Sequence, residues 1–141
     1  MNKINIVGLL GIIIITMSKL SSCHSDLDIK TAQYAVNGQK LYTTHCQNCH
    51  GAKGEGLGKL YPPLTDNKYF RDNRTELSRI VKYGMTGPVN IHGQEYNQQM
   101  PSNPTLSAMD IAYILTYVTT HFGDHKEIYH ENEVIEALNK N

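Results

Sequence analysis

The sequence has no tryptophan and only two phenylalanines, against nine tyrosines, in 141 residues. This is a small aromatic supply for a self-sufficient hydrophobic core, so the composition leaves room for a bound apolar group. Charge of one sign is not in excess either: 13 basic side chains balance 13 acidic ones, which argues against a general nucleic-acid binder. With 40% hydrophobic and 18% charged residues, the chain is expected to fold as one globular domain.

The N-terminal apolar run, residues 6–15, is too short to cross a membrane comfortably, since spanning takes about 20 apolar residues. Preceded by Lys3, it is typical of a secretory signal. Leu20-Ser-Ser-Cys23 then resembles the lipobox of bacterial lipoprotein signals. We therefore expect a signal peptide over 1–22, lipid on Cys23, and export to the periplasmic side of a bacterial membrane. The alternative is an uncleaved N-terminal anchor, which gives the same compartment.

The other two cysteines lie in Cys46-Gln-Asn-Cys49-His50, the C-x-x-C-H pattern of c-type haem attachment. Two thiols at this spacing, on a tight turn that leaves a helix, can reach the two vinyl groups on one edge of a porphyrin. The next residue, His50, then places an imidazole under the iron. A thioredoxin-like redox pair would need a βαβ setting and a zinc ribbon a second ligand pair, and the sequence indicates neither. The motif predicts one covalent haem c.

Hydrophobic periodicity predicts three main helices. They are expected over residues 32–46, over 74–83, and from residue 108 onward. In the first helix, Gly38 should allow close approach by another helix, because glycine otherwise weakens a helix by about 1 kcal/mol. The last helix opens on Ser107 as N-cap, with Asp110 three residues later. Its apolar face is Ile111, Ile114, Leu115 and Val118.

The segments between these helices are rich in glycine and proline, and we expect long loops over 51–64 and 85–104. Residues 23–30 should form a short polar tether before the helical pattern starts. Residues 124–141 are expected to be a polar tail with weak periodicity. Three helices joined by long loops make sense if the loops wrap a flat cofactor.

Over residues 31–123 the chain resembles the class I cytochrome c family. The resemblance rests on Gly38, Tyr42, Cys46-x-x-Cys49-His50-Gly51, Pro62-Pro63-Leu64, Met100-Pro101 and Tyr117. It implies an all-α, cytochrome c-like fold, with three main helices and long loops wrapped around one haem c. It also implies that the Pro62 carbonyl accepts a hydrogen bond from the imidazole of His50, with Leu64 beside the cofactor.

Three methionines, Met85, Met100 and Met109, are candidates for the distal iron ligand. Met109 should pack at the start of the last helix, and Met85 follows a helix stop. Met100 lies in a polar loop before a proline that restricts the backbone, so it is the predicted ligand. A thioether suits haem iron and raises its reduction potential. His92 and His121 are the rival ligands, although both are more readily explained as surface histidines.

These features together predict a monohaem one-electron carrier that meets redox protein partners and is held at the membrane by its lipid anchor. Because both axial positions of the iron are filled, no small-molecule substrate and no bond chemistry are expected. One alternative is a haem subunit fixed in an oxidase, dehydrogenase or reductase complex, docked through residues 124–141. Another is a haem sensor or catalyst with an open iron position.

Overall fold

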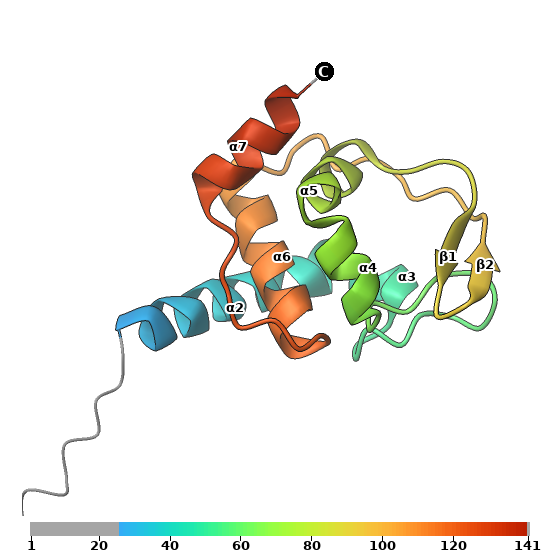
Figure 1. Ribbon diagram of the computed structural model, residues 1–141, viewed down its shortest axis with the longest axis horizontal. Coiled ribbons are helices and arrows are strands. Elements are labelled where there is room, and N and C mark those ends of the chain that lie inside the picture. The colour runs from blue at the N-terminus through green and yellow to red at the C-terminus, as the bar shows by residue number, and fades with distance from the viewer. Residues whose placement is uncertain (1–25, 141) are drawn as a thin grey trace, which may run out of the picture.

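The computed structural model describes residues 26–140 as six helices and one two-stranded sheet (Figure 1). In chain order the elements are α2 (Asp26–His45), α3 (Gln47–His50), α4 (Asn67–Asp72), α5 (Arg74–Tyr83), β1 (Val89–Ile91), β2 (Gln94–Tyr96), α6 (Ala108–His121) and α7 (Glu131–Asn139). The expected helical architecture is confirmed, with a small hairpin added to it. Within this part of the chain, no helix combines the length and the apolar character that crossing a membrane requires. The expected signal peptide and Cys23 lie outside the described residues.

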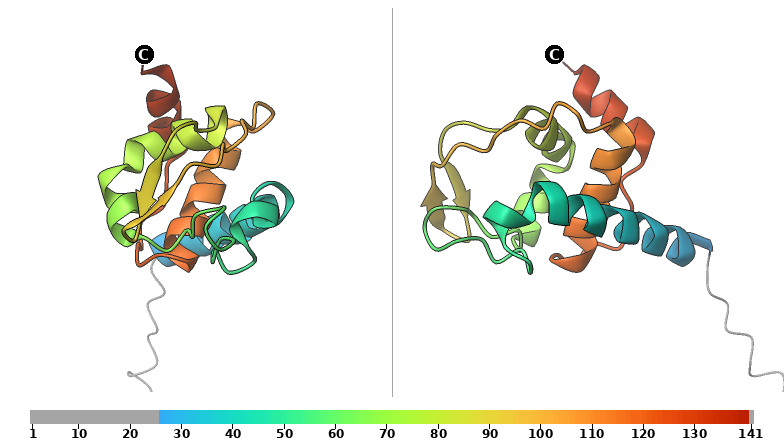
Figure 2. Two further views of the ribbon diagram at one scale, coloured as in Figure 1. Left: turned by 90° about the vertical axis from the view of Figure 1, so that its right-hand side faces the viewer. Right: turned by 180° about the vertical axis from the view of Figure 1, so that it is seen from behind.

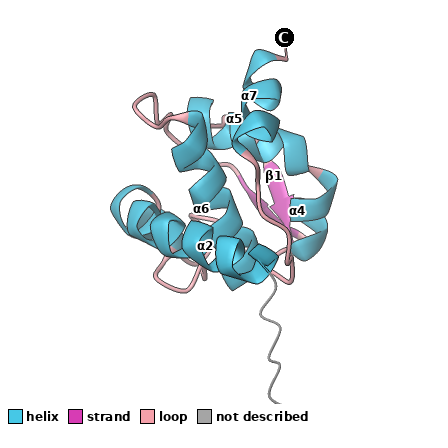
Figure 3. Ribbon diagram, turned by 90° about the vertical axis from the view of Figure 1, so that its left-hand side faces the viewer, coloured by secondary structure: helices cyan, strands magenta, loops and turns pink. Residues whose placement is uncertain are grey.

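Helix α2 crosses α6 at close range (Figures 1 and 3). The crossing point is Gly38, where an added Cβ would lie only 2.0 Å from the backbone oxygen of Tyr113. Beside it, the rings of Tyr42 and Tyr117 pack with their centroids 5.4 Å apart. The close helix approach expected at Gly38 is therefore confirmed, and it fixes the end of α2 that leads into the cysteine motif.

Helix α6 lies at the centre of the core, in contact with α2, α5 and α7 (Figure 2). The expected N-cap is confirmed: the backbone N–H of Asp110 donates to the Ser107 hydroxyl, and the N–H of Ser107 donates to the Asp110 carboxylate at 2.9 Å. The predicted apolar face of this helix is buried: Ile111, Ile114, Leu115 and Val118. Three of these residues, Ile114, Leu115 and Val118, also line the cavity described below.

The segment expected to be a polar tail contains α7, which packs against α5 and α6. Four residues of this segment are buried: Ile128 and Tyr129 just before α7, and Val134 and Ala137 within it. Arg74 of α5 donates to both carboxylate oxygens of Glu133, at 2.7 and 3.0 Å, and its guanidinium lies 4.0 Å from the centroid of the Tyr129 ring. The sequence pattern was weak here because only a few positions of a short helix face the core, and the rest are polar.

Three further elements differ from the expected boundaries. Helix α2 begins at Asp26, inside the expected tether, and α4 lies in a stretch where no helix was predicted. The loop expected over 85–104 contains the β1–β2 hairpin, whose turn residues His92 and Gly93 have φ values of 51° and 78°. With three residues in each strand and six in α4, these elements are too short for a clear periodic signal. The loop over 51–64 holds no helix or strand, as expected.

Candidate functional site

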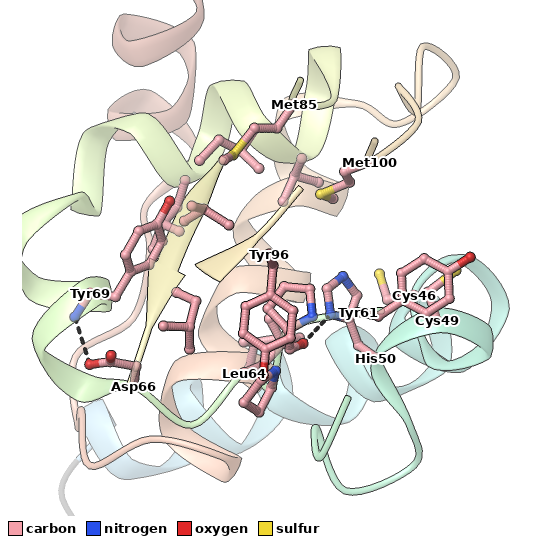
Figure 4. A pocket seen from close by; sticks show the side chains of 18 of the residues that line it. Cys46, Cys49, His50, Tyr61, Leu64, Asp66, Tyr69, Met85, Tyr96 and Met100 are labelled. Carbon is pink, nitrogen blue, oxygen red and sulfur yellow. Dashed lines mark hydrogen bonds between the residues drawn. The ribbon is translucent and has the colours of Figure 1, made fainter. Parts of the chain in front are cut away.

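A large apolar cavity lies between α5, α6, the hairpin and the loop after α3 (Figure 4). The empty space within it, its open side included, is about 1080 Å³. Aliphatic side chains form much of the cavity wall: Leu77, Ile80, Val81, Val89, Ile91, Ile114, Leu115 and Val118. Such a cavity favours a flat, apolar group and excludes water from its faces.

The cysteine motif enters this cavity from the end of α2. Helix α2 ends just before Cys46, and the one-turn helix α3 carries Cys49 and His50. The N–H of His50 donates to the Cys46 carbonyl at 3.0 Å, so the two cysteines and the histidine are held on one tight turn. Both thiols are free. Burial is the main cause that raises the pKa of the Cys46 thiol to about 11, and the neighbouring Cys49 adds to the effect. This group is therefore a neutral thiol at pH 7.

The imidazole of His50 is buried and oriented by a single hydrogen bond. Its Nδ1 lies 3.0 Å from the carbonyl oxygen of Pro62, which can only accept, so Nδ1 carries the proton. Burial lowers the pKa of His50, and this effect outweighs the opposite effect of the hydrogen bond to Pro62. The neutral form of the ring is therefore favoured. The lone pair of Nε2 is thus available to a metal.

Two methionines reach the cavity from its other side (Figure 4). Met85 and Met100 form an isolated antiparallel pair: the N–H of Met85 donates to the Met100 carbonyl at 3.0 Å, and the reverse bond measures 2.9 Å. Residues paired in this way project side chains on the same side of the two strands. Figure 4 shows their sulfur atoms in the upper part of the cavity and His50 below. A group bound between them would meet an imidazole on one face and a thioether on the other.

The rival ligands lie elsewhere. His92 is at the hairpin turn, where its ring nitrogen Nε2 lies 3.2 Å from the Thr65 hydroxyl. The backbone N–H groups of Tyr69 and His92 donate to Asp66, and these bonds lower the pKa of its carboxyl group. His121 is exposed and stacks on Tyr117 with 4.9 Å between the ring centroids. Neither histidine lines the cavity, and the same holds for Met109.

The chain therefore gathers nearly every residue that sequence reasoning singled out for the site. The cavity is lined by Cys46, Cys49, His50, Pro62, Leu64 and Met100. These residues fit haem c: two free thiols on one turn, a neutral imidazole with a free lone pair, a thioether, and an apolar space for the macrocycle. The remaining predicted residue, Cys23, lies outside the described part of the chain.

Sequence reasoning missed the contribution of the hairpin and of α4. Val89 and Ile91 of β1, Tyr96 of β2, and Tyr69 and Phe70 of α4 all line the cavity. The one available signal was the alternation of apolar residues on both sides of a turn at residues 92–93. That signal spans three residues on each side and is easily lost in a loop.

The model of the cytochrome c family matches residues 35–122. The chain belongs to the cytochrome c family. Among its relatives are two proteins called cytochrome c-552, both from Thermus thermophilus. Each is 30% identical over 97 residues, which is 66% of this chain and 73% or 65% of the relative.

A third relative is the cytochrome c subunit of the quinone alcohol dehydrogenase of Gluconacetobacter polyoxogenes, 26% identical over 91 residues. The match covers 64% of this chain but only 19% of that subunit. Membership of the cytochrome c family means that this chain binds haem c covalently and functions in electron transfer. The expected fold and cofactor are therefore confirmed.

Proposed function

We propose that this cytochrome is a monohaem electron carrier in which Cys46 and Cys49 form the two thioethers and His50 and Met100 bind the iron. The observation that carries this assignment is the convergence of these four side chains on one apolar cavity, with the imidazole and the thioether on different sides of it. The bound haem supplies a one-electron Fe(III)/Fe(II) couple. His50 and Met100 would bind the iron, Cys46 and Cys49 would tether the macrocycle, and the apolar lining would keep it dry.

Each residue has a defined task in this proposal. The hydrogen bond from His50 Nδ1 to the Pro62 carbonyl holds the ring in one orientation and strengthens the imidazole as a ligand. The Met100 thioether favours the reduced state and raises the potential. If His50 and Met100 both bind the iron, no position would stay open for a substrate. The aliphatic walls would exclude water from the haem and so keep the solvent rearrangement that accompanies a change of its charge small.

Because Met85 is paired with Met100, removal of one thioether could let the other approach the iron, so both methionines must be substituted. Met100→Ala, Met85→Ala and the double variant should therefore be compared after co-expression with a c-type haem maturation system. Met100→Ala should keep the covalent haem, lose the near-infrared sulfur-to-iron band of the oxidised protein, and have a lower potential. Met85→Ala should keep the band.

Two outcomes would contradict the ligand assignment. If Met100→Ala keeps the band and Met85→Ala loses it, the ligand is Met85. If the double variant also keeps the band, neither methionine is the ligand. If the wild-type protein carries no covalent haem, the roles of Cys46, Cys49 and His50 are wrong. Carbon monoxide binding to the reduced wild-type protein at neutral pH would indicate an open iron position and favour the sensor or catalyst.

We further propose that residues 1–22 are a cleaved signal peptide and that lipid on Cys23 holds the protein on the periplasmic side of a bacterial membrane. The apolar run over 6–15 and the sequence Leu20-Ser-Ser-Cys23 support this. Export is also consistent with thioether formation, which takes place outside the bacterial cytoplasm. Mass spectrometry of the mature protein should find a diacylglycerol-modified Cys23 at its N-terminus. A Cys23→Ala variant should remain unprocessed and unlipidated.

A second candidate is a haem subunit of a larger redox complex. It is favoured by the similarity to the cytochrome c subunit of a quinone alcohol dehydrogenase. The apolar residues of the C-terminal segment pack inward, so docking through it would have to use its polar face, where Ile135 is 41% exposed. Affinity purification of the full-length chain from native membranes distinguishes the two: a stoichiometric dehydrogenase or oxidase indicates a subunit, and the cytochrome alone a carrier.

A further inference from the structure

We propose that Lys82 and Asn103 are positioning residues that hold the Met100 loop in place against the end of α5 and thereby keep the thioether on the iron. The inference rests on the proposed role of Met100 as distal ligand. It concerns the segment 100–106, which connects the Met85–Met100 pair to the N-cap of α6. A thioether is a weak ligand, so the geometry of this segment decides how well it competes with other ligands.

Asn103 caps the C-terminus of α5. The last turn of a helix leaves carbonyl groups without partners inside the helix. Here the backbone N–H of Asn103 donates to the Lys82 carbonyl at 3.0 Å, and its side-chain Nδ2 donates to the Val81 carbonyl at 3.0 Å. A loop residue that follows Met100 by three positions thus satisfies two carbonyls of the helix that lines the cavity.

Lys82 makes the opposite connection, from the helix to the loop. Its ammonium Nζ donates to the carbonyl of Pro104 at 2.9 Å and to the carbonyl of Leu106 at 2.6 Å. The positive charge also lies at the C-terminus of α5, where the helix dipole favours it. A surface lysine normally extends into solvent, whereas this one is half-buried and bridges two backbone oxygens of a loop.

The other end of the loop is fixed by the Met85–Met100 pair, directly after Gly84. At Gly84 φ is +77°, and an added Cβ would lie 2.4 Å from the Met100 carbonyl oxygen. The backbone around Met100 is therefore held on one side by the pair and on the other by Asn103 and Lys82. Removal of the second attachment should let the loop sample open positions, in which the thioether leaves the iron.

Imidazole binding to the oxidised, haem-loaded protein measures this directly, because imidazole competes with the thioether for the iron. In Lys82→Met the side chain keeps its length but loses its charge and its donors. Loss of hydrogen bonds from a charged group should make imidazole bind about tenfold more tightly. Asn103→Ala should act in the same direction. Lys82→Arg keeps the charge and the donors and should restore weak binding.

Lys126→Met is the matched control, since Lys126 is exposed and makes no hydrogen bond within the described chain. Its imidazole affinity and sulfur-to-iron band should equal those of the wild type. The proposal is overturned if Lys82→Met and Asn103→Ala also bind imidazole like the wild type. It is equally overturned if Lys82→Arg is as defective as Lys82→Met. Where Lys82→Met does not accumulate with haem, Asn103→Ala decides alone.

This test separates the inference from the ligand assignment on which it rests. If the wild-type protein lacks the sulfur-to-iron band and binds imidazole without competition, the assignment of Met100 has failed. If the band is present in the wild type and lost in Met100→Ala, but the Lys82 and Asn103 variants behave like the wild type, Met100 remains the ligand and the positioning role is wrong. The potential of Lys82→Met provides a second readout and should fall when the thioether is lost more often.

Discussion

Substitution of Gly38 by alanine sets two effects of opposite sign against each other. Within a helix, alanine is more favourable than glycine by about 1 kcal/mol, so helix propensity alone predicts a more stable protein. At the crossing of α2 and α6, however, the new Cβ would lie 2.0 Å from the Tyr113 carbonyl oxygen and 2.7 Å from the Tyr117 Cβ. Since contact distances between such atoms are about 3.5 Å, the helices must separate by roughly 1 Å or more.

Overpacking of this kind usually costs about 1–3 kcal/mol, and here the obstacle is backbone, which cannot rotate away. We therefore expect a cost at the upper end of this range, about 3 kcal/mol, which exceeds the gain of about 1 kcal/mol in helix propensity and leaves a net decrease of about 2 kcal/mol in the free energy of unfolding. For a domain of this size that corresponds to a fall of roughly 10 °C in Tm. Guanidinium and thermal unfolding of the haem-loaded protein, followed by circular dichroism, measure both quantities.

Gln39→Ala is the control for this substitution, because Gln39 is exposed and lies next to Gly38 on α2. Here propensity acts alone, and stability should be unchanged or slightly higher. A Gly38→Ala variant as stable as the wild type, or more stable, would falsify the argument, since it would mean that α2 and α6 do not approach each other as closely as the structure indicates.

Three further substitutions test contacts that support the fold around the cavity. Arg74→Ala removes both hydrogen bonds to the Glu133 carboxylate, so it should lower the free energy of unfolding by about 1–3 kcal/mol and expose the segment containing α7 to proteolysis. Arg74→Lys should recover only part of the lost stability, because lysine cannot donate to both carboxylate oxygens in the same geometry. Backbone hydrogen bonds lower the pKa of Asp66, so its contribution to stability is present above the unfolded-state pKa and is lost as the pH falls through the lower folded-state pKa. Denaturation of Asp66→Asn at decreasing pH should therefore show a shallower loss of stability in acid than that of the wild type. Tyr42→Phe removes a 2.6 Å hydrogen bond to the carbonyl of Gly51 and should cost about 1 kcal/mol in thermal unfolding, with an unchanged potential indicating that the ligands stay in place.

Features decided by neighbouring residues were predictable. The spacing of Cys46, Cys49 and His50 is a matter of one helical turn, so the haem motif could be recognised without any tertiary information. The cap formed by Ser107 and Asp110 is equally local, and the structure contains it as expected. In both cases the chemistry depends on residues three or four positions apart, whose geometry is set by the backbone alone.

Features that depend on contacts between distant segments were harder to predict. Helix α7 looked like a polar tail, because only its contacts with α5 and α6 make its few apolar residues a buried face. The hairpin over 89–96 was assigned to a loop, because strands of three residues give no periodic signal. The hydrogen bond from His50 to Pro62 was implied only by the family resemblance, since the two residues are twelve positions apart.

The spacing of two thiols and an imidazole predicts a covalent haem attached at Cys46 and Cys49 without any knowledge of the fold, because these groups carry that chemistry wherever the turn is placed. Which side chains surround the cofactor depends on how the chain folds. Folding brings Met85 beside Met100, places Lys82 of α5 against the loop that carries Met100, and closes the cavity with the hairpin and α4. These contacts join segments far apart in the chain, and such segments meet only after the helices have packed.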